Sequence, residues 1–329
     1  MIKLAKKSFL FLMILAAIFT MTSCGDEDND STPISIQIYT ENGRPYLNFG
    51  RYPQTVVSDE NLIKELEKIT ETNSFGYIEY NGEEYKKHVA DRFNSNSIFQ
   101  NGNEVVEGKA YYFKVEPIKW RVLKASDGSY KLLSEYLLDT PQFYTLKNDR
   151  TINGTTIYPN NYEYSNIRAW LNGYNGTSYG VEDYTNKGFI DIAFTEKEKA
   201  IIKTTLVDNS VSSTGDSTNK YACNNTYDKI YLLSYKEVTN TTYGFSSSYS
   251  YDSSREAKTT DYAVARYCWM WSNGKGVWWL RSPHDSGSNS SNYARSVYSD
   301  GHIYGYNSVE GFINGSGFGV RAALEINYE

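Results

Sequence analysis

Three histidines are the residues in this 329-residue chain best suited to acid–base or metal chemistry. His284 is followed by Asp285, and His302 follows Asp300 after one glycine, so an imidazole and a carboxylate are close together twice. An enzyme, or the remnant of one, that used these groups would need both segments to meet in space. His88 stands alone, and no histidine spacing matches a metal motif such as H-E-x-x-H. We therefore expect no cofactor and keep catalysis as the alternative to simple binding.

Tyrosine is the other side chain that stands out, with 31 residues against 14 Phe and 6 Trp. A tyrosine offers a large ring and a polar tip at a small entropic cost, which suits a binding surface. Tyrosines also fill half-exposed strand positions, so this explanation stays open. Two of them, Tyr304 and Tyr306, would share one face of an extended strand. The sequence predicts a non-enzymatic recognition surface for a glycan or protein ligand, formed by Tyr293, Tyr298, Tyr304, Tyr306 and Asn307.

The segment from His284 to Phe318 has an unusual composition. It is dominated by Ser, Gly, Asn, Tyr and Asp, contains no Lys, Gln, Met or Trp, and has one glutamate, Glu310. If the adenines of an AAC or AAT codon for Asn are randomised, the codon can encode most residue types. It can never encode Lys, Gln, Met, Trp or Glu, the five types that are absent or rare in this segment. Two explanations stay open: diversification by a retroelement, and a loop-rich segment that is naturally poor in Lys and Gln.

The N-terminus has the layout of a secretory signal peptide. Three lysines within the first seven residues precede an apolar run from Ser8 to Met21, which is too short for a mature membrane span. The run ends at Ser23-Cys24-Gly25, which resembles the bacterial lipobox. We expect residues 1–23 to be removed and Cys24 to be lipidated. An ordinary signal peptide with an incidental cysteine, or a signal anchor, is the alternative.

Residues 24–33 are expected to form a flexible tether, because the acidic run Gly25–Asp30 offers nothing apolar to bury. An acidic run at this place resembles the surface-export signal of lipoproteins in the Bacteroides group. It predicts a lipid-anchored outer-membrane protein at the cell surface, and a solvated spacer facing the periplasm is the alternative. The net charge of −6 and pI near 5.3 argue against a nucleic-acid partner.

Residues 34–329 predict a single α+β domain of short strands and few helices. Asn81-Gly82 and Asp127-Gly128 each separate two strand-like runs, which indicates two hairpins. Alternation predicts a strand at Ile34–Ile38. Capping residues indicate helices that begin near Ser58, Ser165 and Thr195. Further strands are expected at 230–234, 277–281, 294–298, 303–306 and 320–326.

Several residues are expected to be buried. Arg281 and Arg321 lie inside apolar strand motifs, where an arginine is costly unless paired, so we expect ion pairs to Glu135 or Glu325. Cys223 and Cys268 form either one disulfide or two buried thiols. The apolar motifs also predict buried indoles at Trp120, Trp170, Trp278 and Trp279.

Seven short motifs together resemble a bacterial family, the domain of unknown function number 6273, from about Tyr46 to the end. They occur in this order: Phe49–Gln54 (FGRYPQ), Pro117–Leu123 (PIKWRVL), Leu132–Glu135 (LLSE), Ser165–Asn172 (SNIRAWLN), Leu232–Ser234 (LLS), Trp278–Pro283 (WWLRSP) and Gly319–Leu324 (GVRAAL).

That family is similar to the C-type-lectin-like fold. The resemblance implies a small twisted, mostly antiparallel sheet with two mid-chain helices and long C-terminal loops. Formylglycine-generating enzymes share the fold but need a redox cysteine pair near the C-terminus, and no cysteine follows Cys268. The calcium triplet of lectins is also missing, because Glu116-Pro117 precedes Ile118. Oxygen ligands for calcium would have to come from Asp285, Asp300 and Asn307.

Overall fold

The computed structural model describes residues 34–95, 97–126, 128–146, 148–285, 290–304, 311–312 and 317–328. The chain divides into two units, residues 1–31 and 32–329, and all described residues belong to the second. Within these ranges the protein is mixed α and β, with mostly antiparallel sheets, few helices and no closed barrel. None of the described helices has the length and apolar character that a membrane span requires.

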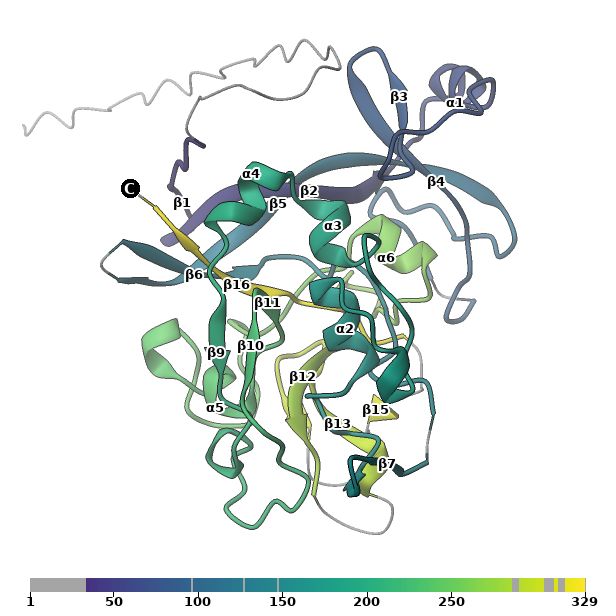
Figure 1. The fold of residues 1–329 in the computed structure, drawn as a ribbon. Helices are drawn as coiled ribbons and strands as arrows, with labels where there is room; N and C mark the ends of the chain where they lie inside the picture. Colours follow the sequence, from purple (N-terminus) through teal and green to yellow (C-terminus); the bar gives the residue numbers. More distant parts are fainter. Residues whose placement is uncertain are drawn as a thin grey trace, which may run out of the picture. The chain divides into compact units, whose positions relative to one another are not determined.

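An eight-stranded sheet runs across the upper half of Figure 1. Its strand order is β1-β2-β5-β6-β16-β11, and β4 extends it by pairing with both β5 and β3. All of these pairs are antiparallel, and the sheet is larger than the small one that the sequence predicted. Its strands are β1 (Tyr39–Glu41), β2 (Arg44–Val56), β3 (Ile78–Tyr80), β4 (Glu83–Val89), β5 (Ala110–Ser126), β6 (Ser129–Ser134), β11 (Ile230–Tyr231) and β16 (Ala323–Asn327).

Both predicted hairpins are confirmed. Asn81 and Gly82 connect β3 to β4 with φ values of 51° and 79°, the left-handed pair that a two-residue type I′ turn requires. The second hairpin joins β5 to β6 through Gly128, which has a φ of 70°. Asp127 lies outside the described residues. These two turns fix the register of the strands that flank them.

A second sheet of four strands lies in the lower half of Figure 1. In it β13 is central and pairs antiparallel with the other three strands. The strands are β12 (Trp278–Pro283), β13 (Tyr293–Val297), β14 (Ile303–Tyr304) and β15 (Gly311–Phe312). Two separate ribbons pair β7 (Arg150–Ile152) with β8 (Thr155–Ile157) and β9 (Thr205–Val207) with β10 (Thr226–Asp228).

Six short α-helices occur in the described residues: the one predicted near Ser58, the two predicted in mid-chain, and three more. They are α1 (Glu60–Leu66), α2 (Asn166–Asn172), α3 (Phe189–Ala193), α4 (Glu196–Ile201), α5 (Tyr235–Val238) and α6 (Asp261–Ala265). The predicted caps of α2 and α4 are confirmed, because Ser165 and Thr195 each accept a hydrogen bond from a backbone N–H of the first turn. For α1 the cap is Asp59 and not Ser58. Four 3₁₀ turns complete the set: η1 (Thr177–Tyr179), η2 (Val211–Ser213), η3 (Thr241–Tyr243) and η4 (Ser290–Asn292).

The strand predicted at Ile34–Ile38 is wrong. The chain is irregular there, and β1 begins one residue later, at Tyr39. Ile36 packs against the main core, whereas Ile38 is exposed. The alternation therefore reflects one anchored side chain and not a paired strand.

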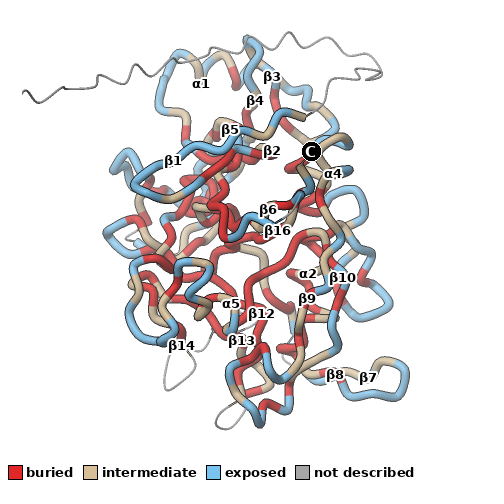
Figure 2. Tube along the Cα trace, turned by 90° about the vertical axis from the view of Figure 1, so that its left-hand side faces the viewer, coloured by how far each residue is buried: buried red, intermediate tan, exposed pale blue. Residues whose placement is uncertain are grey.

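The main core lies between the sheets and the helices α2, α3 and α6, where the tube in Figure 2 is red. The four tryptophans expected in the core are confirmed as buried: Trp120, Trp170, Trp278 and Trp279. Trp120 also donates its indole N–H to the carbonyl of Phe49 at 2.7 Å, so the ring loses no hydrogen bond on burial. A smaller cluster around Leu66 and Tyr85 packs α1 against β3 and β4.

Arg255 is fully buried and uses all five of its guanidinium N–H groups. Nε donates to the carbonyl of Gly301 at 2.8 Å. Three of the others donate to carbonyls of one loop, those of Ser246, Ser248 and Ser250, and the fourth donates to the carbonyl of Val238, the last residue of α5. The carbonyl of Arg255 itself accepts from the Trp278 indole and from Arg321. One buried side chain thus holds an irregular loop against β12 and the turn at Gly301.

Arg321 is also fully buried and confirms the predicted pairing with Glu135, at 3.4 Å. Arg121 binds the same carboxylate through Nε at 2.9 Å and Nη2 at 2.7 Å. Arg321 further donates to the carbonyl of Ser134 and lies over the Trp278 ring. This cluster joins β5, β6 and the segment that precedes β16.

Arg281 has a different partner from the one predicted. It pairs with Glu237 of α5 and not with Glu135 or Glu325. Its remaining donors bind the side-chain oxygen of Asn209 at 3.1 Å and two main-chain carbonyls. Burial would raise the pKa of Glu237, but the charges of Arg281 and Lys131 outweigh burial and lower it to about 2.

Cys223 and Cys268 are free thiols, which answers the question that the sequence left open. Cys268 is fully buried. Burial raises the pKa of both thiols, that of Cys223 to about 11, so neither ionises near neutral pH.

The first prediction concerns Arg255. Arg255→Met leaves five main-chain carbonyls without their donors, so we expect a loss of roughly 3 to 5 kcal/mol in the free energy of unfolding. Limited proteolysis should then cut the loop at residues 246–250. The control is Arg92→Met, because Arg92 makes one hydrogen bond to a carbonyl and lies near the surface. Equal stability losses in the two variants would contradict the role of Arg255.

The second prediction concerns the pH dependence of stability. The folded-state pKa of Glu237 is about 2, below its ordinary value of 4.5. Its contribution is therefore complete above the unfolded-state pKa and is lost as the pH falls from 4.5 towards 2, by about 3 kcal/mol. Urea unfolding followed by tryptophan fluorescence should show a flatter pH profile for Glu237→Gln than for the wild type. Glu196→Gln, at an exposed carboxylate, is the control and should keep the wild-type slope. A stability profile of Glu237→Gln that runs parallel to the wild-type profile would refute the ion pairing of Glu237.

Candidate functional site

A continuous group of aromatic rings lies beside β13 and β14, and we call it the aromatic surface. Its centre is formed by Trp269, Trp271, Tyr298 and Tyr304. The ring centroids are 5.9 Å apart between the two tryptophans, 6.1 Å between Trp271 and Tyr298, and 4.9 Å between the two tyrosines. At one end Phe93 stacks on Trp269 at 5.4 Å.

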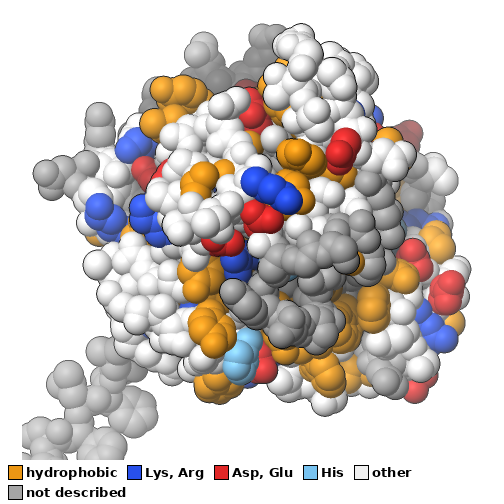
Figure 3. Space-filling model, turned by 90° about the horizontal axis from the view of Figure 1, so that it is seen from below, with side chains coloured by type: hydrophobic (Ala, Val, Ile, Leu, Met, Phe, Trp, Pro, Cys, Tyr) orange, Lys and Arg blue, Asp and Glu red, His pale blue; other side chains and the backbone are white. Residues whose placement is uncertain are grey.

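These rings are partly accessible to solvent. Trp271 is 43% exposed, and Trp269, Tyr298 and Tyr304 are half-buried. The ring planes turn by 35° to 63° from one neighbour to the next, so the surface presents both faces and edges. β14 lies in the lower half of Figure 2, and Figure 3, drawn from below, shows several groups of hydrophobic side chains on that face.

Two tight backbone segments position the rings. Tyr298 follows β13 and is held by a turn in which its N–H donates to the carbonyl of His302 at 2.8 Å. Gly301 donates back to Tyr298 at 2.9 Å, and its own carbonyl accepts from Arg255. Trp269 and Trp271 stand on an irregular segment that pairs with the carbonyls of Gly317 and Lys275. The buried guanidinium therefore holds the turn that carries Tyr298, whereas main-chain hydrogen bonds hold the segment that carries the two tryptophans.

Tyr267 lies at the edge of the aromatic surface in an unfavourable backbone conformation. Its φ is 80°, a value that residues other than glycine and asparagine rarely adopt. Its ring packs against Phe93 at 5.3 Å. Strained residues of this kind persist where the surrounding structure holds them, and they concentrate at functional sites.

Polar groups border the same surface. Nδ1 of His302 lies 3.1 Å from a carboxylate oxygen of Asp300, and both side chains are partly exposed. The His302 ring also lies near Tyr304, at 6.4 Å, and near the exposed Tyr251, at 6.3 Å. Burial and the neighbouring Tyr304 raise the pKa of Tyr298, so its phenol stays neutral and can donate a hydrogen bond.

The structure brings together only some of the residues that the sequence singled out for ligand binding. Tyr298 and Tyr304 are adjacent, but Tyr293 lies at the other end of β13. Five residues of extended strand span about 16 Å, which separates Tyr293 from the others. Tyr306 and Asn307 lie outside the described residues, as does Cys24.

The two histidine–aspartate pairs do not meet. The backbone N–H of His284 bonds to Tyr293, whereas His302 bonds to Tyr298, so the pairs occupy opposite ends of β13. His284 is buried, and Asp285 accepts a hydrogen bond from the backbone of Lys220. Among the described residues no three His, Cys, Asp or Glu side chains gather as metal ligands would. The geometry therefore gives no support to the catalytic alternative.

The tryptophan half of the aromatic surface was not predicted from the sequence. Trp269 and Trp271 alternate with Cys268 and Met270, which are buried, so this spacing could have marked them as outward-facing. Nothing in the sequence indicated that Phe93 lies at the aromatic surface, because its contact with Trp269 joins segments far apart in the chain.

The antiparallel sheets and the exposed rings define a mixed α/β domain with a candidate ligand-binding surface. The chain belongs to the family described as domain of unknown function (DUF6273), which matches residues 127–328. The match includes the central rings of the aromatic surface but not Phe93, and it begins later than the motifs from Tyr46 suggested. No curated protein and no solved structure matches the chain.

Proposed function

We propose that this protein is a non-enzymatic recognition module that binds a glycan through its aromatic surface. The observation that carries the proposal is the chain of partly exposed rings from Trp269 to Tyr304, with neighbouring centroids 4.9 to 6.1 Å apart. Aromatic rings left at the surface in such a group are typical of binding sites, because their exposure to water is unfavourable.

The chemistry of the rings fits a sugar. The face of an aromatic ring carries partial negative charge, and the C–H groups of a pyranose ring carry partial positive charge, so the two attract when stacked. The phenols of Tyr298 and Tyr304 and the pair formed by His302 and Asp300 supply hydrogen-bonding groups at the border. Hydroxyl-rich ligands need both kinds of contact.

The charges favour a neutral ligand over a charged one. Lys275, the lysine nearest in sequence to Trp271, is paired with Glu256. Arg295, the arginine of β13, is buried. Protein interfaces are typically rich in arginine as well as aromatic residues, and this surface supplies only the aromatic part. A neutral glycan therefore fits better than an acidic protein partner.

The fold belongs, in this proposal, to the C-type-lectin-like class. The support is that the closing Gly-Val-Arg segment returns beside the tryptophan-rich strand, as that fold requires. Gly319 forms a parallel bridge with Trp278, and the two segments exchange hydrogen bonds of 2.7 and 3.1 Å. An experimental structure whose strand order differs from that of lectin domains would refute this assignment.

The protein is displayed, in this proposal, on the cell surface by a lipid anchor. Lipidation at Cys24 and the acidic tether at residues 24–33 would hold the domain at the outer membrane and let it sample ligands nearby. Two or more acyl chains give stable anchoring, because each buried methylene contributes about 0.8 kcal/mol.

The third prediction tests the aromatic surface. Trp271→Ala should weaken binding to a neutral polysaccharide at least about tenfold, because it removes an exposed stacking ring. The measurement is affinity electrophoresis in gels that contain soluble glucans, mannans or xylans. The melting temperature should change little, since Trp271 is 43% exposed.

Tyr227→Ala is the control, because Tyr227 is 65% exposed on β10, outside the aromatic surface. Tyr304→Ala should repeat the loss of binding. If the wild-type protein binds none of the neutral polysaccharides but binds an isolated protein partner through Trp271, the ligand is a protein and not a glycan. Unchanged binding by Trp271→Ala would remove this surface as the site.

The fourth prediction tests the anchor. Cys24→Ala should release the protein from the membrane fraction, and metabolic labelling with a fatty acid should be lost. If the variant stays in the outer membrane with unchanged mobility in gels, lipidation at Cys24 is wrong. Protease treatment of whole cells should remove the wild-type protein, and protection from protease would place it on the periplasmic side.

A further inference from the structure

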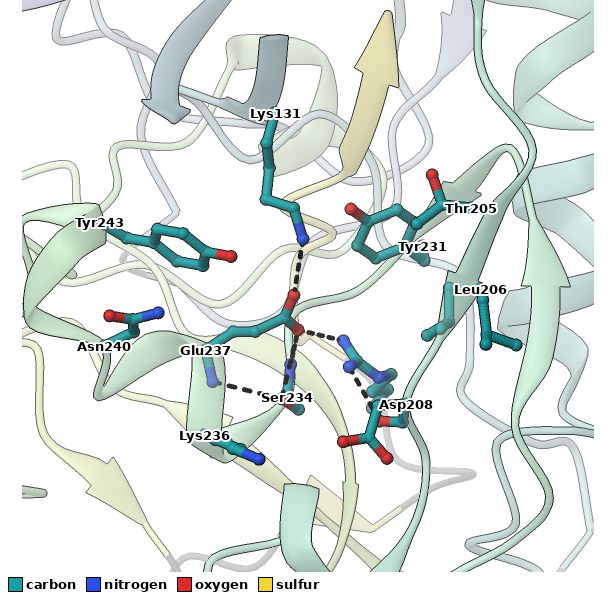
Figure 4. A pocket seen from close by; sticks show the side chains of 12 residues that line it. Lys131, Thr205, Leu206, Asp208, Tyr231, Ser234, Lys236, Glu237, Asn240 and Tyr243 are labelled. Atoms are coloured by element: carbon teal, nitrogen blue, oxygen red, sulfur yellow. Dashed lines mark hydrogen bonds and ion pairs between the residues drawn. The ribbon is translucent and has the colours of Figure 1, made fainter. Parts of the chain in front are cut away.

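A polar pocket lies between the edge of the main sheet and α5, and none of its residues belongs to the aromatic surface (Figure 4). Its volume is about 250 Å³. That is room for roughly eight water molecules, which suits one monosaccharide-sized molecule. The residues that line it belong to β6, β9, β11, α5, η3 and β12 or directly adjoin β9, α5 and η3, and all lie within the family match at 127–328.

Glu237 forms the floor of the pocket and is already satisfied. One of its carboxylate oxygens accepts from Arg281 and from the backbone N–H of Ser234, the latter at 2.9 Å. The other oxygen lies 3.1 Å from the Lys131 ammonium. Dashed lines in Figure 4 mark these contacts. The carboxylate therefore positions Lys131 and is not itself available to a ligand.

Lys131 extends into the pocket between two aromatic rings. Its ammonium is 5.4 Å from the centroid of Tyr231 and 5.5 Å from that of Tyr243. Burial would lower the pKa of Lys131, but Tyr231, Glu237 and Tyr243 raise it, so the ammonium stays charged. Figure 4 shows the ammonium pointing at the space that the two tyrosines border.

The charges around the pocket leave one positive charge in excess. Lys131, Lys236 and Arg281 line the pocket with Asp208 and Glu237. Glu325, which lies 3.4 Å from Lys131, is shared with Lys203 at 3.5 Å, and this additional pair leaves the balance unchanged. A ligand with a single negative charge would neutralise the site.

Several hydroxyl and amide groups in the pocket lack partners. The Thr205 hydroxyl is buried and has no hydrogen-bond partner among the described residues. The buried Tyr231 hydroxyl contacts the Lys131 ammonium, which can only donate, so the hydroxyl proton has no acceptor among the described residues. Asn240 uses its side-chain oxygen to cap Thr242, which leaves its amide nitrogen directed at the pocket. Buried hydroxyls are rarely left in this state, and a bound polar molecule supplies what they lack.

We propose that this pocket binds a small hydroxylated carboxylic acid, with the carboxylate at Lys131 and the hydroxyl groups at Thr205, Asn240 and the two tyrosines. The excess charge selects one carboxylate over a neutral sugar. The unpartnered hydroxyls select a ligand that can both donate and accept. The proposal does not depend on the aromatic surface, because the pocket and the rings share no residue.

Isothermal titration of the whole folded chain with D-glucuronate tests the proposal, with D-glucose as the neutral counterpart of the same size. We expect glucuronate to bind at least about tenfold more tightly than glucose, because hydrogen bonds to charged groups are the stronger ones. Thr205→Val and Tyr243→Phe remove hydroxyls and keep the shape of the pocket, so each should weaken glucuronate binding about five- to tenfold. Tyr227→Phe, outside the pocket, should bind as the wild type does.

Lys131→Met should abolish the preference for the acid, and the two hydroxyl variants decide the case if Lys131→Met does not fold. Equal binding of glucuronate and glucose would refute the role of the charge. Absence of binding to glucuronate, galacturonate and gluconate would show that the pocket holds only water and overturn the proposal. If Trp271→Ala weakens glucuronate binding as strongly as Thr205→Val does, the acid binds at the aromatic surface and not in the pocket. A failure of the pocket proposal can therefore be distinguished from a failure of glycan recognition.

Discussion

The buried guanidinium of Arg255 is the interaction on which the rest of the domain depends. Its five N–H groups bind five carbonyls: three in the irregular loop at residues 246–250, one at the end of α5 and one in the turn at Gly301. These carbonyls replace water around the cation. Asp252 lies 3.5 Å away and supplies the nearest negative charge. Because Gly301 is one of the five, the turn that carries Tyr298 is fixed before any ligand arrives. Such preorganisation lowers the entropic cost of binding.

In two other buried clusters, a few carboxylates neutralise a larger number of cations. Glu135 pairs with Arg121 and Arg321. Glu237 pairs with Arg281 and Lys131, and Glu325 pairs with Lys131 and Lys203. In each cluster the cations therefore outnumber the carboxylates by one, although the chain as a whole has a net charge of −6. A buried cation that is incompletely neutralised favours an anion next to it. The pocket beside Lys131 is the place where this excess reaches a space large enough for a ligand.

Local signals allowed much of the fold to be predicted, and long-range pairing explains what was missed. Asn81-Gly82 and Ser165 act through their own neighbours, so the turn and the cap were visible in the sequence. The eight-stranded sheet was not, because β16 inserts between β6 and β11 from the far end of the chain. The tyrosines close in sequence to Tyr298 were expected to be close in space, yet an extended strand carries Tyr293 away while a loop brings Trp271 in. The pocket joins Lys131 to Glu237, 106 residues later, so no local pattern in the sequence could bring these two side chains together.

The turn at Gly301 limits how this segment can evolve. Gly301 has a φ of 82°, and a Cβ there would come within 1.9 Å of the Asp252 carbonyl oxygen. Ala294, Val297 and Ile303 nearby are buried and face the core. Any lineage that alters this region to meet new ligands must therefore keep the glycine and the inward side chains, while Tyr298, His302 and Tyr304 remain free to change. Homologues should show an alternating pattern of fixed and variable columns here, with the invariant glycine marking the centre of the most variable stretch.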